Sequence, residues 1–428
     1  MTVPIPQSEY AEIFSCLRNV RHAGLAVSGG ADSTALMHLA HRWRAAAGGS
    51  APRLTVLSVD HSLRDGSADE AQWVADQAAI LGLDAAILRW DAGTIDRRIQ
   101  ERARFARYSL MANYAHANGL DALVTAHHLD DQAETVLMRL GRGSGIDGLA
   151  GIPRSGQWAG LAVLRPLLDV SRARLVATLE DLGVGWLEDP SNEDSRFERV
   201  RIRQAIGKFG AIGIDPAALA RSAVRLRRAR EALDMAASAF LGNEASVNDV
   251  GYGQIRTGAF RHAPREIALR ALAKMIQTVG GRINPPPLAR VESLAEGICS
   301  GDETSRTLGG CRVVPDRQDI LVLRETGRTA LETMVLRPGE SGLWDNRFHV
   351  SLDAVCRSGV EVRALGERAY GHVRARLGAP INLPAHAAEG LVSFWRNEDV
   401  LCVPTIGYFA ESGEGRGCAA RFVNRLAP

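Results

Sequence analysis

The sequence predicts an α/β protein with an N-terminal doubly wound parallel sheet, a mainly helical middle domain and a small β-rich C-terminal domain. In the first 150 residues, short apolar runs alternate with segments of helical spacing, which is typical of a parallel sheet covered on both faces. Helical, arginine-rich segments dominate from about residue 206, and strand-like runs dominate from residue 331. A length of 428 residues suits two or three domains, which we expect at 1–205, 206–330 and 331–428.

Alternating strands and helices are expected in the first 150 residues. The strands are short, apolar and partly β-branched, and the helices repeat apolar side chains three or four positions apart. The expected strands are Gly24–Ser28, Leu54–Val59, Ala85–Leu88 and Ala122–Thr125. The expected helices are Thr34–Ala47, Ala68–Leu81, Ile95–Asn118 and Asp131–Leu140.

The elements that follow are less regular. A glycine-rich connection at 141–151 is either a mobile lid or a plain surface loop. We then expect a strand, a helix capped by its first serine, and a turn, at Arg165–Leu168, Ser171–Leu182 and Asp189–Asn192. Farther along we expect two helices and a hairpin, at Pro216–Leu241, Ala263–Val279 and Thr307–Leu323.

The composition excludes several classes of protein. With 51 basic and 49 acidic side chains, the net charge of +2 excludes a uniformly basic nucleic-acid coat and an acidic tail protein. The six cysteines form no Cys-x-x-Cys pair, which argues against a disulfide scaffold and a zinc ribbon. No segment approaches the roughly 18–20 apolar residues of a membrane span, so we expect a cytoplasmic protein without a membrane partner.

The charge is unevenly distributed along the chain. Residues 1–205 carry 22 basic and 25 acidic side chains, residues 206–330 carry 18 and 13, and residues 331–428 carry 11 of each. Of the basic residues, 49 are arginine, which we attribute first to base composition and second to a preference for phosphate-matching cations. The middle domain is therefore the basic one.

A phosphate-binding loop is predicted at Ser28-Gly-Gly-Ala-Asp-Ser33, between an expected strand and an expected helix. Backbone N–H groups of such a turn point into one concavity, to which the helix N-terminus adds positive potential. The two glycines allow a phosphate to approach the backbone, the serines offer hydroxyls, and Asp32 offers a metal ligand. An ordinary capping turn is the alternative, but this combination is more specific than a Gly-Gly pair.

Two further polar clusters follow expected strands. Asp60–His61 ends the second strand and His127–Glu134 follows the fourth. Because ligands of open α/β sheets bind outside the carboxyl ends of the strands, all three clusters should lie on one edge. Asp131 and Glu134 should share a helix face, and Asp130 could cap that helix. Metal binding and acid–base chemistry are both open to these side chains.

The loop resembles the pyrophosphate-binding loop of the N-type ATP pyrophosphatases, and the wider pattern resembles the tRNA(Ile)-lysidine synthetases. The likeness is close over about residues 20–205 and loose beyond. Val200 stands where the family commonly has Asn, within a run that keeps its cations. The motifs that carry the resemblance are Ser28–Ser33, Val59–Arg64, Arg107–Tyr108, His127–Glu134, Arg142–Gly145, Gly148–Leu149, Arg165–Leu168 and Glu188–Asn192.

The resemblance implies a two-step reaction with ATP and Mg²⁺. ATP adenylates the C2 carbonyl oxygen of the wobble cytidine in an isoleucine tRNA with a CAU anticodon, and pyrophosphate leaves. The side-chain amine of free L-lysine then displaces AMP and forms lysidine, which changes the codon read from AUG to AUA. The resemblance assigns Asp32 to Mg²⁺ and phosphate, and Arg107, His127 and Asp131 to the reaction centre. Asp131 is the first candidate for orienting or deprotonating lysine and His127 for the adenylation step, a division that the sequence leaves open.

The nucleotide and the RNA would each need further contacts. The expected nucleotide-binding residues are Ser28, Gly29, Gly30, Ala31, Asp32, Ser33, Asp60 and His61. A phosphate backbone suits a basic helix face with arginines at i, i+4 and i+7, although a solvated arginine face is the alternative. The expected RNA-binding residues are Arg199, Arg201, Arg203, Arg221, Arg225 and Arg228. The resemblance favours a monomer or a homodimer.

Two other functions share parts of this pattern. One is another enzyme on the same loop, either a tRNA thiolase or an amidating GMP or NAD synthetase. Thiolases of the two-thiocytidine type need paired cysteines, and GMP synthetase would carry a glutaminase cysteine or a dimerisation module; the sequence shows neither. The other is a catalytically inactive nucleotide sensor that binds RNA. Intact Asp32, Ser33, His127 and Asp131 argue against a sensor.

Overall fold

The computed structural model describes most of the chain. The described residues are 2–62, 66–90, 99–188, 196, 198–209, 212–327, 331–377, 383–384, 386–411, 413–423 and 426. The chain divides into two compact units, Met1–Arg230 and Glu231–Pro428. The three expected domains remain a proposal, and the turn expected at Asp189–Asn192 lies outside the described residues. Among the described helices, none is both long and apolar enough to cross a membrane.

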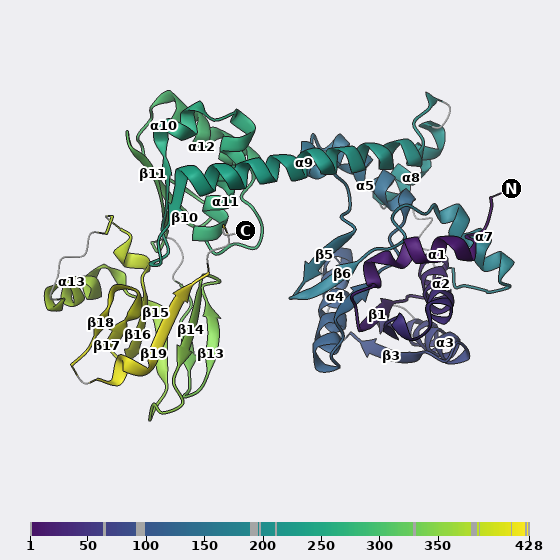
Figure 1. The fold of residues 1–428 in the computed structure, drawn as a ribbon, viewed down its shortest axis with the longest axis horizontal. Coiled ribbons are helices and arrows are strands. Elements are labelled where there is room, and N and C mark those ends of the chain that lie inside the picture. Colours follow the sequence, from purple (N-terminus) through teal and green to yellow (C-terminus); the bar gives the residue numbers. More distant parts are fainter. Residues whose placement is uncertain are drawn as a thin grey trace. The chain divides into compact units, whose positions relative to one another are not determined.

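The first unit is built on a six-stranded sheet with strand order β3-β2-β1-β4-β6-β5 (Figure 1). Its first five strands in that order are parallel to their neighbours, and β5 is antiparallel to β6. The strands are β1 His22–Ala26, β2 Arg53–Asp60, β3 Asp84–Arg89, β4 Ala122–Val124, β5 Ser155–Trp158 and β6 Leu161–Leu164. The predicted parallel sheet is confirmed, with one antiparallel strand at its edge.

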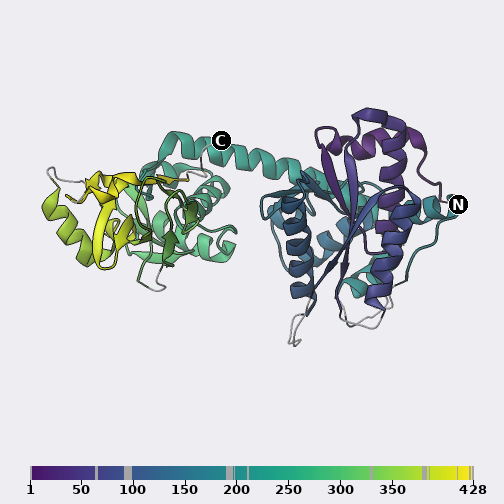
Figure 2. The ribbon, with the colours of Figure 1, turned by 90° about the horizontal axis from the view of Figure 1, so that it is seen from below.

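Helices cover both faces of this sheet, because neighbouring side chains of a strand point to opposite sides (Figure 2). Leu54 and Val56 of β2 belong to the core shared with α1, α2, α3 and α7, whereas Leu57 packs with Tyr108 and Met111 of α4. The helices of this unit are α1 Gln7–Ile13, α2 Ala31–Ala47, α3 Ser67–Ile80, α4 Ile99–Ala117, α5 Leu129–Gly141, α6 Ile146–Leu149, α7 Arg172–Asp181 and α8 Glu198–Phe209. The doubly wound arrangement follows from this alternation.

One predicted strand is wrong. The segment Arg165–Leu168 is a turn, and β6 lies four residues earlier. Pro166 explains the difference, because proline has no N–H to donate to a neighbouring strand. In β6, by contrast, three of the four side chains are buried in the sheet. The cap expected at Ser171 is confirmed, since its Oγ accepts a hydrogen bond from the N–H of Arg174 at 3.4 Å.

The second unit contains a helical part and a β-rich part, as predicted. Helices α10, α11 and α12 pack on an antiparallel sheet of order β7-β8-β11-β10-β9, and two further sheets follow, of order β12-β15-β16-β17-β18 and β13-β14-β19. The helices are α9 Pro216–Glu244, which begins in the first unit, α10 Thr257–His262, α11 Arg265–Val279, α12 Leu288–Ser300 and α13 Gly366–Arg376. The strands are β7 Ala245–Val247, β8 Gly253–Arg256, β9 Arg306–Leu308, β10 Cys311–Pro315, β11 Asp319–Arg324, β12 Met334–Leu336, β13 Ser341–Trp344, β14 Phe348–Leu352, β15 Val360–Ala364, β16 Val392–Arg396, β17 Asp399–Val403, β18 Tyr408–Phe409 and β19 Cys418–Phe422.

A buried ion cluster connects the sheets of the second unit. Arg347 is 1% exposed, and its Nε donates to Asp345 Oδ2 at 2.6 Å. Arg324 of β11 donates to both carboxylate oxygens of Asp345 at 2.9 Å. Because a buried charge is tolerated only with partners, this cluster fixes the turn between β13 and β14 against β11.

Candidate active site

The predicted phosphate-binding loop lies between β1 and the first turn of α2. Gly29 has a φ of +88°, and a Cβ there would lie 2.7 Å from Leu187 Cδ1, so the position requires glycine. Ser33 Oγ accepts from the N–H of Ser28 at 3.1 Å and donates to the carbonyl of Gly30 at 3.0 Å. Ser33 therefore holds the shape of the loop. The first N–H groups of α2 have no acceptor within the helix and form an anion-binding end.

Gly29→Ala is expected to weaken ATP binding about tenfold or more. The methyl group would contact Leu187, and an alanine in the left-handed region costs roughly 1–2 kcal/mol. Gly48→Ala is the matched control, since Gly48 has a φ of +62° but open space around its Cβ position at the far end of α2. Calorimetric titration with ATP should show a weaker Kd for the first variant only. Equal ATP affinity in both variants would remove the loop from the nucleotide site.

A buried histidine lies among three carboxylates beside this loop. His128 is 2% exposed; its Nε2 lies 3.5 Å from Asp32 Oδ2 and from Asp131 Oδ2, and its Nδ1 lies 3.5 Å from Asp130 Oδ2. Burial opposes a charge on this ring, but the carboxylates outweigh it and raise the pKa of His128 to about 10. His128 is therefore a fixed cation that joins the starts of α2 and α5. His128 belongs to the predicted motif, but the residue predicted for the reaction centre was its neighbour His127.

Asp32 has the environment of a metal ligand. Burial would raise the pKa of Asp32, but His128 and then Arg172, whose Nε lies 3.4 Å from Oδ1, keep that pKa below its ordinary value. Its Oδ1 is buried and has no hydrogen-bond partner among the described residues. An ionised oxygen beside a phosphate loop suits Mg²⁺, which takes few protein ligands and completes its shell with phosphates and water. The described residues contain no group of three or more His, Cys, Asp or Glu that could hold a metal ion by themselves.

Two carboxylates of α5 hold α8. Glu134 is fully buried and accepts from Arg199 Nε at 2.6 Å and from Arg203 Nε at 2.7 Å. Asp131 accepts from Arg199 Nη2 at 2.8 Å, so one arginine binds both acids. This agrees with the prediction that Asp131 and Glu134 share one face of the helix. Arg199 and Arg203 were expected to bind RNA. The structure gives them a partner inside the site, and RNA contact there remains a prediction.

Asp130 does not cap its own helix, contrary to expectation. Its Oδ2 accepts from the N–H of Arg172, the first residue of α7, at 2.8 Å. At the start of α5 the N–H of His128 instead donates to Asp131 Oδ2 at 3.0 Å. Asp131 is the third residue of α5, and a side chain at this position can reach back to the backbone N–H of the capping residue. Asp131 therefore takes the role that was expected of Asp130.

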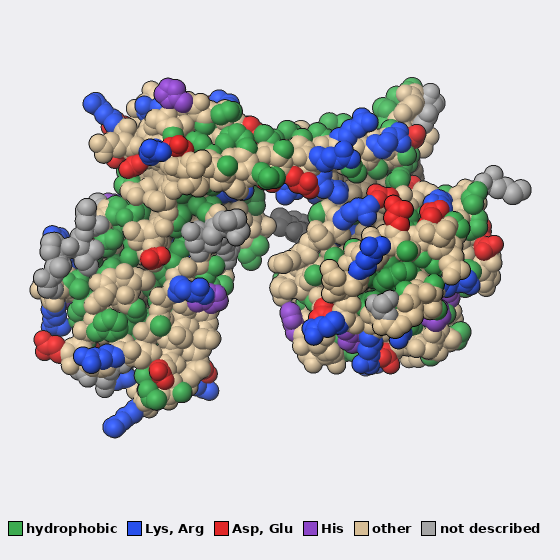
Figure 3. Space-filling model, viewed as in Figure 1, with side chains coloured by type: hydrophobic (Ala, Val, Ile, Leu, Met, Phe, Trp, Pro, Cys, Tyr) green, Lys and Arg blue, Asp and Glu red, His purple; other side chains and the backbone are tan. Residues whose placement is uncertain are grey.

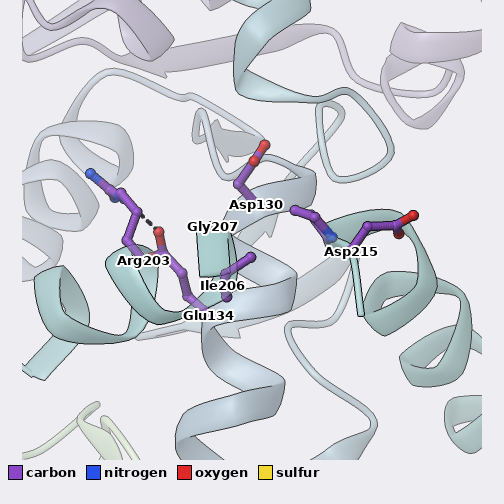
Figure 4. Close-up of a pocket in the computed structure, with 7 residues that line it drawn as sticks. Asp130, Glu134, Arg203, Ile206, Gly207 and Asp215 are labelled. Atoms are coloured by element: carbon purple, nitrogen blue, oxygen red, sulfur yellow. Dashed lines mark hydrogen bonds and ion pairs between the residues drawn. The ribbon is translucent and has the colours of Figure 1, made fainter. Parts of the chain in front are cut away.

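A pocket is formed by α5, α8 and the start of α9. Its volume of about 340 Å³ is at the lower end of the usual range for small-molecule sites, roughly 300–1,000 Å³. Figure 4 shows Arg203 paired with Glu134 on one side and Asp215 on another. With three carboxylates and one arginine, the lining is acidic. The lining residues are Asp130, Glu134, Arg203, Ile206, Gly207, Asp215 and Pro216.

Asp60 and His61 lie at the end of β2, on the same edge of the sheet as the loop. Asp60 Oδ1 accepts from the N–H of Ser62 at 2.9 Å and from Ser67 Oγ at 2.7 Å, so this carboxylate shapes the turn after β2. Burial, and then the nearby cation of Arg107 on α4, lowers the pKa of His61 to about 4. Arg107, which was expected at the reaction centre, therefore acts on His61. Nucleotide contacts of Asp60 and His61 remain a prediction.

His127 is a neutral ring, in contrast to His128. Its Nδ1 lies 2.8 Å from Thr125 Oγ1. Burial lowers the pKa of His127 to about 4, with Asp131 opposing the shift and Arg165 and Arg104 reinforcing it. At neutral pH this side chain can donate or accept a hydrogen bond but carries no charge. The two adjacent histidines therefore have different chemistry because their surroundings differ.

The glycine-rich segment after α5 is anchored at its end. Gln132 exchanges two hydrogen bonds with the backbone of Ile152, each at 2.7 Å. Arg139 of α5 and Arg227 of α9 donate to further carbonyls between residues 148 and 152. Since Gln132 directly follows the catalytic candidate Asp131, these contacts favour a fixed support for α5 over a mobile lid.

The predicted arginine face of α9 is exposed. Arg221, Arg225 and Arg228 all reach solvent at helical spacing. Figure 3 shows basic side chains gathered over this end of α9. Arg201 is also exposed on α8, where its Nη1 donates to the carbonyl of Arg196 at 2.9 Å. A basic surface of this kind is available to a phosphate backbone.

Arg225→Ala combined with Arg228→Ala should weaken RNA binding without loss of stability. Each phosphate contact contributes a slope of about −0.7 to −0.9 in log K against log salt, so the slope should become shallower by roughly 1.4–1.8. The matched control is Arg18→Ala with Arg42→Ala, two exposed arginines remote from α9 in the sequence. Filter binding of an isoleucine tRNA at several salt concentrations measures both. An unchanged slope in the α9 variant would exclude this face from the interface.

The fold and the site together define a class of enzyme. A parallel sheet with a Ser-Gly-Gly-x-Asp-Ser loop at a helix N-terminus is a PP-loop nucleotide site, and the PP-loop domain family matches residues 4–209. The chain is 39% identical to a tRNA(Ile)-lysidine synthase of Ruegeria pomeroyi, over 90% of this chain and 89% of that protein. It is 42% identical to one of a Bradyrhizobium species, over 72% and 86%. The chain belongs to the tRNA(Ile)-lysidine synthase family and is an ATP-using enzyme.

A solved structure resembles part of this chain at low identity. A U34-tRNA thiolase from Methanococcus maripaludis is 17% identical, with a TM-score of 0.45, over 53% of this chain and 78% of that chain. The first unit of this protein contains a single cysteine, Cys16, which lies at the surface. The paired cysteines of the rival thiolase chemistry are therefore absent from the PP-loop domain.

Proposed function

We propose that this enzyme converts the wobble cytidine of an isoleucine tRNA with a CAU anticodon to lysidine. In the first step the C2 carbonyl oxygen attacks the α-phosphate of ATP, the Pα–O–Pβ bond breaks and pyrophosphate leaves. In the second step the ε-amine of L-lysine bonds to C2, the C2–O bond breaks, AMP leaves and the amine loses a proton. The observation that carries this proposal is the convergence of the loop, Asp32, His128 and Asp131 in a chain of this family.

The adenylation step places growing negative charge on the departing pyrophosphate. The N–H groups at the start of α2 are aimed at that charge, and Gly29 lets the phosphates approach them. Asp32 is the residue that would hold Mg²⁺, which when bound neutralises phosphate charge. The charged His128 keeps Asp32 ionised and in place beside the loop. Arg172, 3.4 Å from Asp32, adds a second cation on the same side.

The second step needs an uncharged lysine amine. The reference pKa of lysine is about 10.4, so the amine is mostly protonated at neutral pH and must lose a proton before it attacks. We assign the orientation of this amine to Asp131, which lies between Arg199 and His128 in the first turn of α5. We assign His127, a neutral hydrogen-bonding ring, to the adenylation step. A neutral donor or acceptor suits a carbonyl that is changing its electron distribution.

The acidic pocket is our proposed site for L-lysine. Its volume suits a single amino acid, and its carboxylates attract a cation. Arg203 supplies a guanidinium for the carboxylate of the amino acid, because only its Nε is used by Glu134 in the bonds described. Asp130 lines the pocket and also lies 3.5 Å from His128, so the pocket and the phosphate site share a wall. An amine bound in the pocket is therefore close to the reaction centre.

The tRNA is proposed to contact the exposed arginines of α9 and the basic middle domain. The middle residues 206–330 carry the surplus of cations, and Arg221, Arg225 and Arg228 present it along one helix. A cytoplasmic location and a monomeric or dimeric state remain predictions.

The position of ATP cleavage and the identity of the acceptor test this function. ATP labelled in the α-phosphate should yield AMP, never ADP, and only when the CAU tRNA is present. Mass spectrometry of the digested RNA should show cytidine plus lysine minus water when lysine is supplied. Product formed with ammonia or sulfide in place of lysine would instead identify one of the amidating or thiolating relatives of the loop.

A further inference from the structure

Two aromatic side chains of the first unit, the exposed Phe105 of α4 and the half-buried Trp158 of β5, pack together at the surface. Phe105 is 62% exposed, and its ring centroid is 5.3 Å from that of Trp158 with the ring planes at 67°. Trp158 also contacts Tyr108, at 5.2 Å and 41°. Tyr108 is buried in the core of the sheet face, so Phe105 and Trp158 extend that core outward to the surface.

Three arginines flank this pair. Arg102, Arg104 and Arg107 are exposed on the first half of α4. The guanidinium carbon of Arg104 lies 5.2 Å from the centroid of the Tyr108 ring, within cation–π range. The surface therefore combines aromatic faces with cations, without an acidic residue between positions 102 and 108. A polyanion with flat apolar groups matches both features, whereas a purely apolar partner would match only one.

The charges of Arg104 and Arg107 on this surface act on two histidines of the candidate site. Arg104 is one of the cations that lower the pKa of His127, and Arg107 lowers the pKa of His61, in each case after burial of the histidine. Since α4 follows β3, its first turns also lie at the carboxyl edge of the sheet, where the phosphate loop lies.

The proposed reaction requires help at this location. The C2 carbonyl of a cytidine stacked in a loop is shielded by its neighbours, so the enzyme must take the base out of the stack. When the cytidine leaves the stack, the base next to it loses stacking energy. An aromatic side chain can replace this stacking for any base.

We propose that Phe105 and Trp158 form a stacking platform for an unpaired base of the tRNA anticodon loop adjacent to the modified cytidine, with Arg102, Arg104 and Arg107 on the flanking phosphates. This inference rests on the proposed function. It identifies the surface that receives the single-stranded part of the substrate, separate from the arginine face of α9.

Phe105→Ala and Phe105→Trp test this platform with an anticodon stem-loop RNA. Alanine at a base-stacking position lowers affinity roughly 5- to 150-fold, and tryptophan should keep affinity within about twofold. The salt slope should stay the same in both variants, because no phosphate contact is lost. Ile80→Ala is the matched control, since Ile80 is 75% exposed on α3 of the same unit. That variant should bind RNA like the wild type.

A change in the RNA makes the test specific. Replacing the base next to the cytidine by an abasic site should weaken wild-type binding and leave Phe105→Ala unaffected, so the two losses should not add. Additive losses, or unchanged affinity in Phe105→Ala, would overturn the platform. Loss of self-association in sedimentation, without loss of RNA affinity, would show that Phe105 contacts a second copy of the chain. If the wild type fails to modify tRNA at all, the proposed function fails independently of this result.

Discussion

Asp32→Ala is expected to abolish pyrophosphate release, with a loss of at least about 10²- to 10³-fold in rate. Asp32 offers a buried carboxylate oxygen that has no hydrogen-bond partner among the described residues, directly beside the phosphate loop. Without it the phosphates would lose the proposed ligand of Mg²⁺, and electrostatic stabilisation of the transition state of this kind is typically worth that much. His128 would also lose one of its three carboxylate neighbours. A coupled assay for pyrophosphate, with saturating tRNA and lysine, measures the rate.

The control must separate chemistry from folding. Asp69 is an exposed acid in the first turn of α3, a helix that also follows a strand of the parallel sheet, and Asp69→Ala should change the rate less than about twofold. Asp32→Asn keeps the shape of the side chain but removes its charge, so it should be nearly as inactive as Asp32→Ala. Substantial pyrophosphate release by Asp32→Asn would show that the charge at position 32 is dispensable.

Glu134→Gln should raise the KM for lysine and lower the stability of the first unit together. Glu134 is a fully buried acceptor for Arg199 and Arg203, and breaking such a pair typically costs about 3–5 kcal/mol, less here because both arginines are about 40% exposed. Arg199 also orients Asp131. The proposed lysine site would therefore lose the pairing of its lining residues Glu134 and Arg203, and also the orientation of Asp131. We expect a rise of about tenfold or more in the KM for lysine, with a smaller change in the KM for ATP.

Glu198→Gln is the matched control for this helix. Glu198 lies at the start of α8 and pairs with Arg142 at the surface, at 2.5 Å, where a single ion pair contributes roughly 0–1 kcal/mol. Thermal unfolding and lysine titrations of both variants, at equal tRNA and ATP, give the comparison. A Glu134→Gln enzyme with wild-type KM for lysine would exclude the pocket between α5 and α8 as the amino-acid site.

Local patterns predicted the phosphate loop and most of the sheet correctly. The loop is contiguous in sequence, and the turn at Gly29 depends on a left-handed backbone that glycine adopts readily. The strands β1 to β4 are short apolar runs bounded by turns, so their periodicity was sufficient. The error at Arg165–Leu168 arose because its leucines are buried in a turn rather than in a ladder.

Partners distant in sequence explain what was missed. His128 and His127 are equivalent in the sequence, but only His128 is surrounded by carboxylates from both α2 and α5. Arg199 was expected at the RNA surface, and its acceptors are 65 and 68 residues away on α5. Asp130 likewise serves α7, 42 residues downstream, instead of its own helix. Such pairings depend on tertiary packing, which no local spacing encodes.

Transfer of labelled lysine tests the central claim most directly. The protein is incubated with ATP, Mg²⁺, labelled L-lysine and an isoleucine tRNA transcript with a CAU anticodon, beside a transcript with uridine at the wobble position. We predict one lysine bound per CAU transcript, with one AMP and one pyrophosphate formed for each, and no label in the uridine transcript. Well-folded protein that binds ATP but transfers no lysine and releases no pyrophosphate would contradict the account.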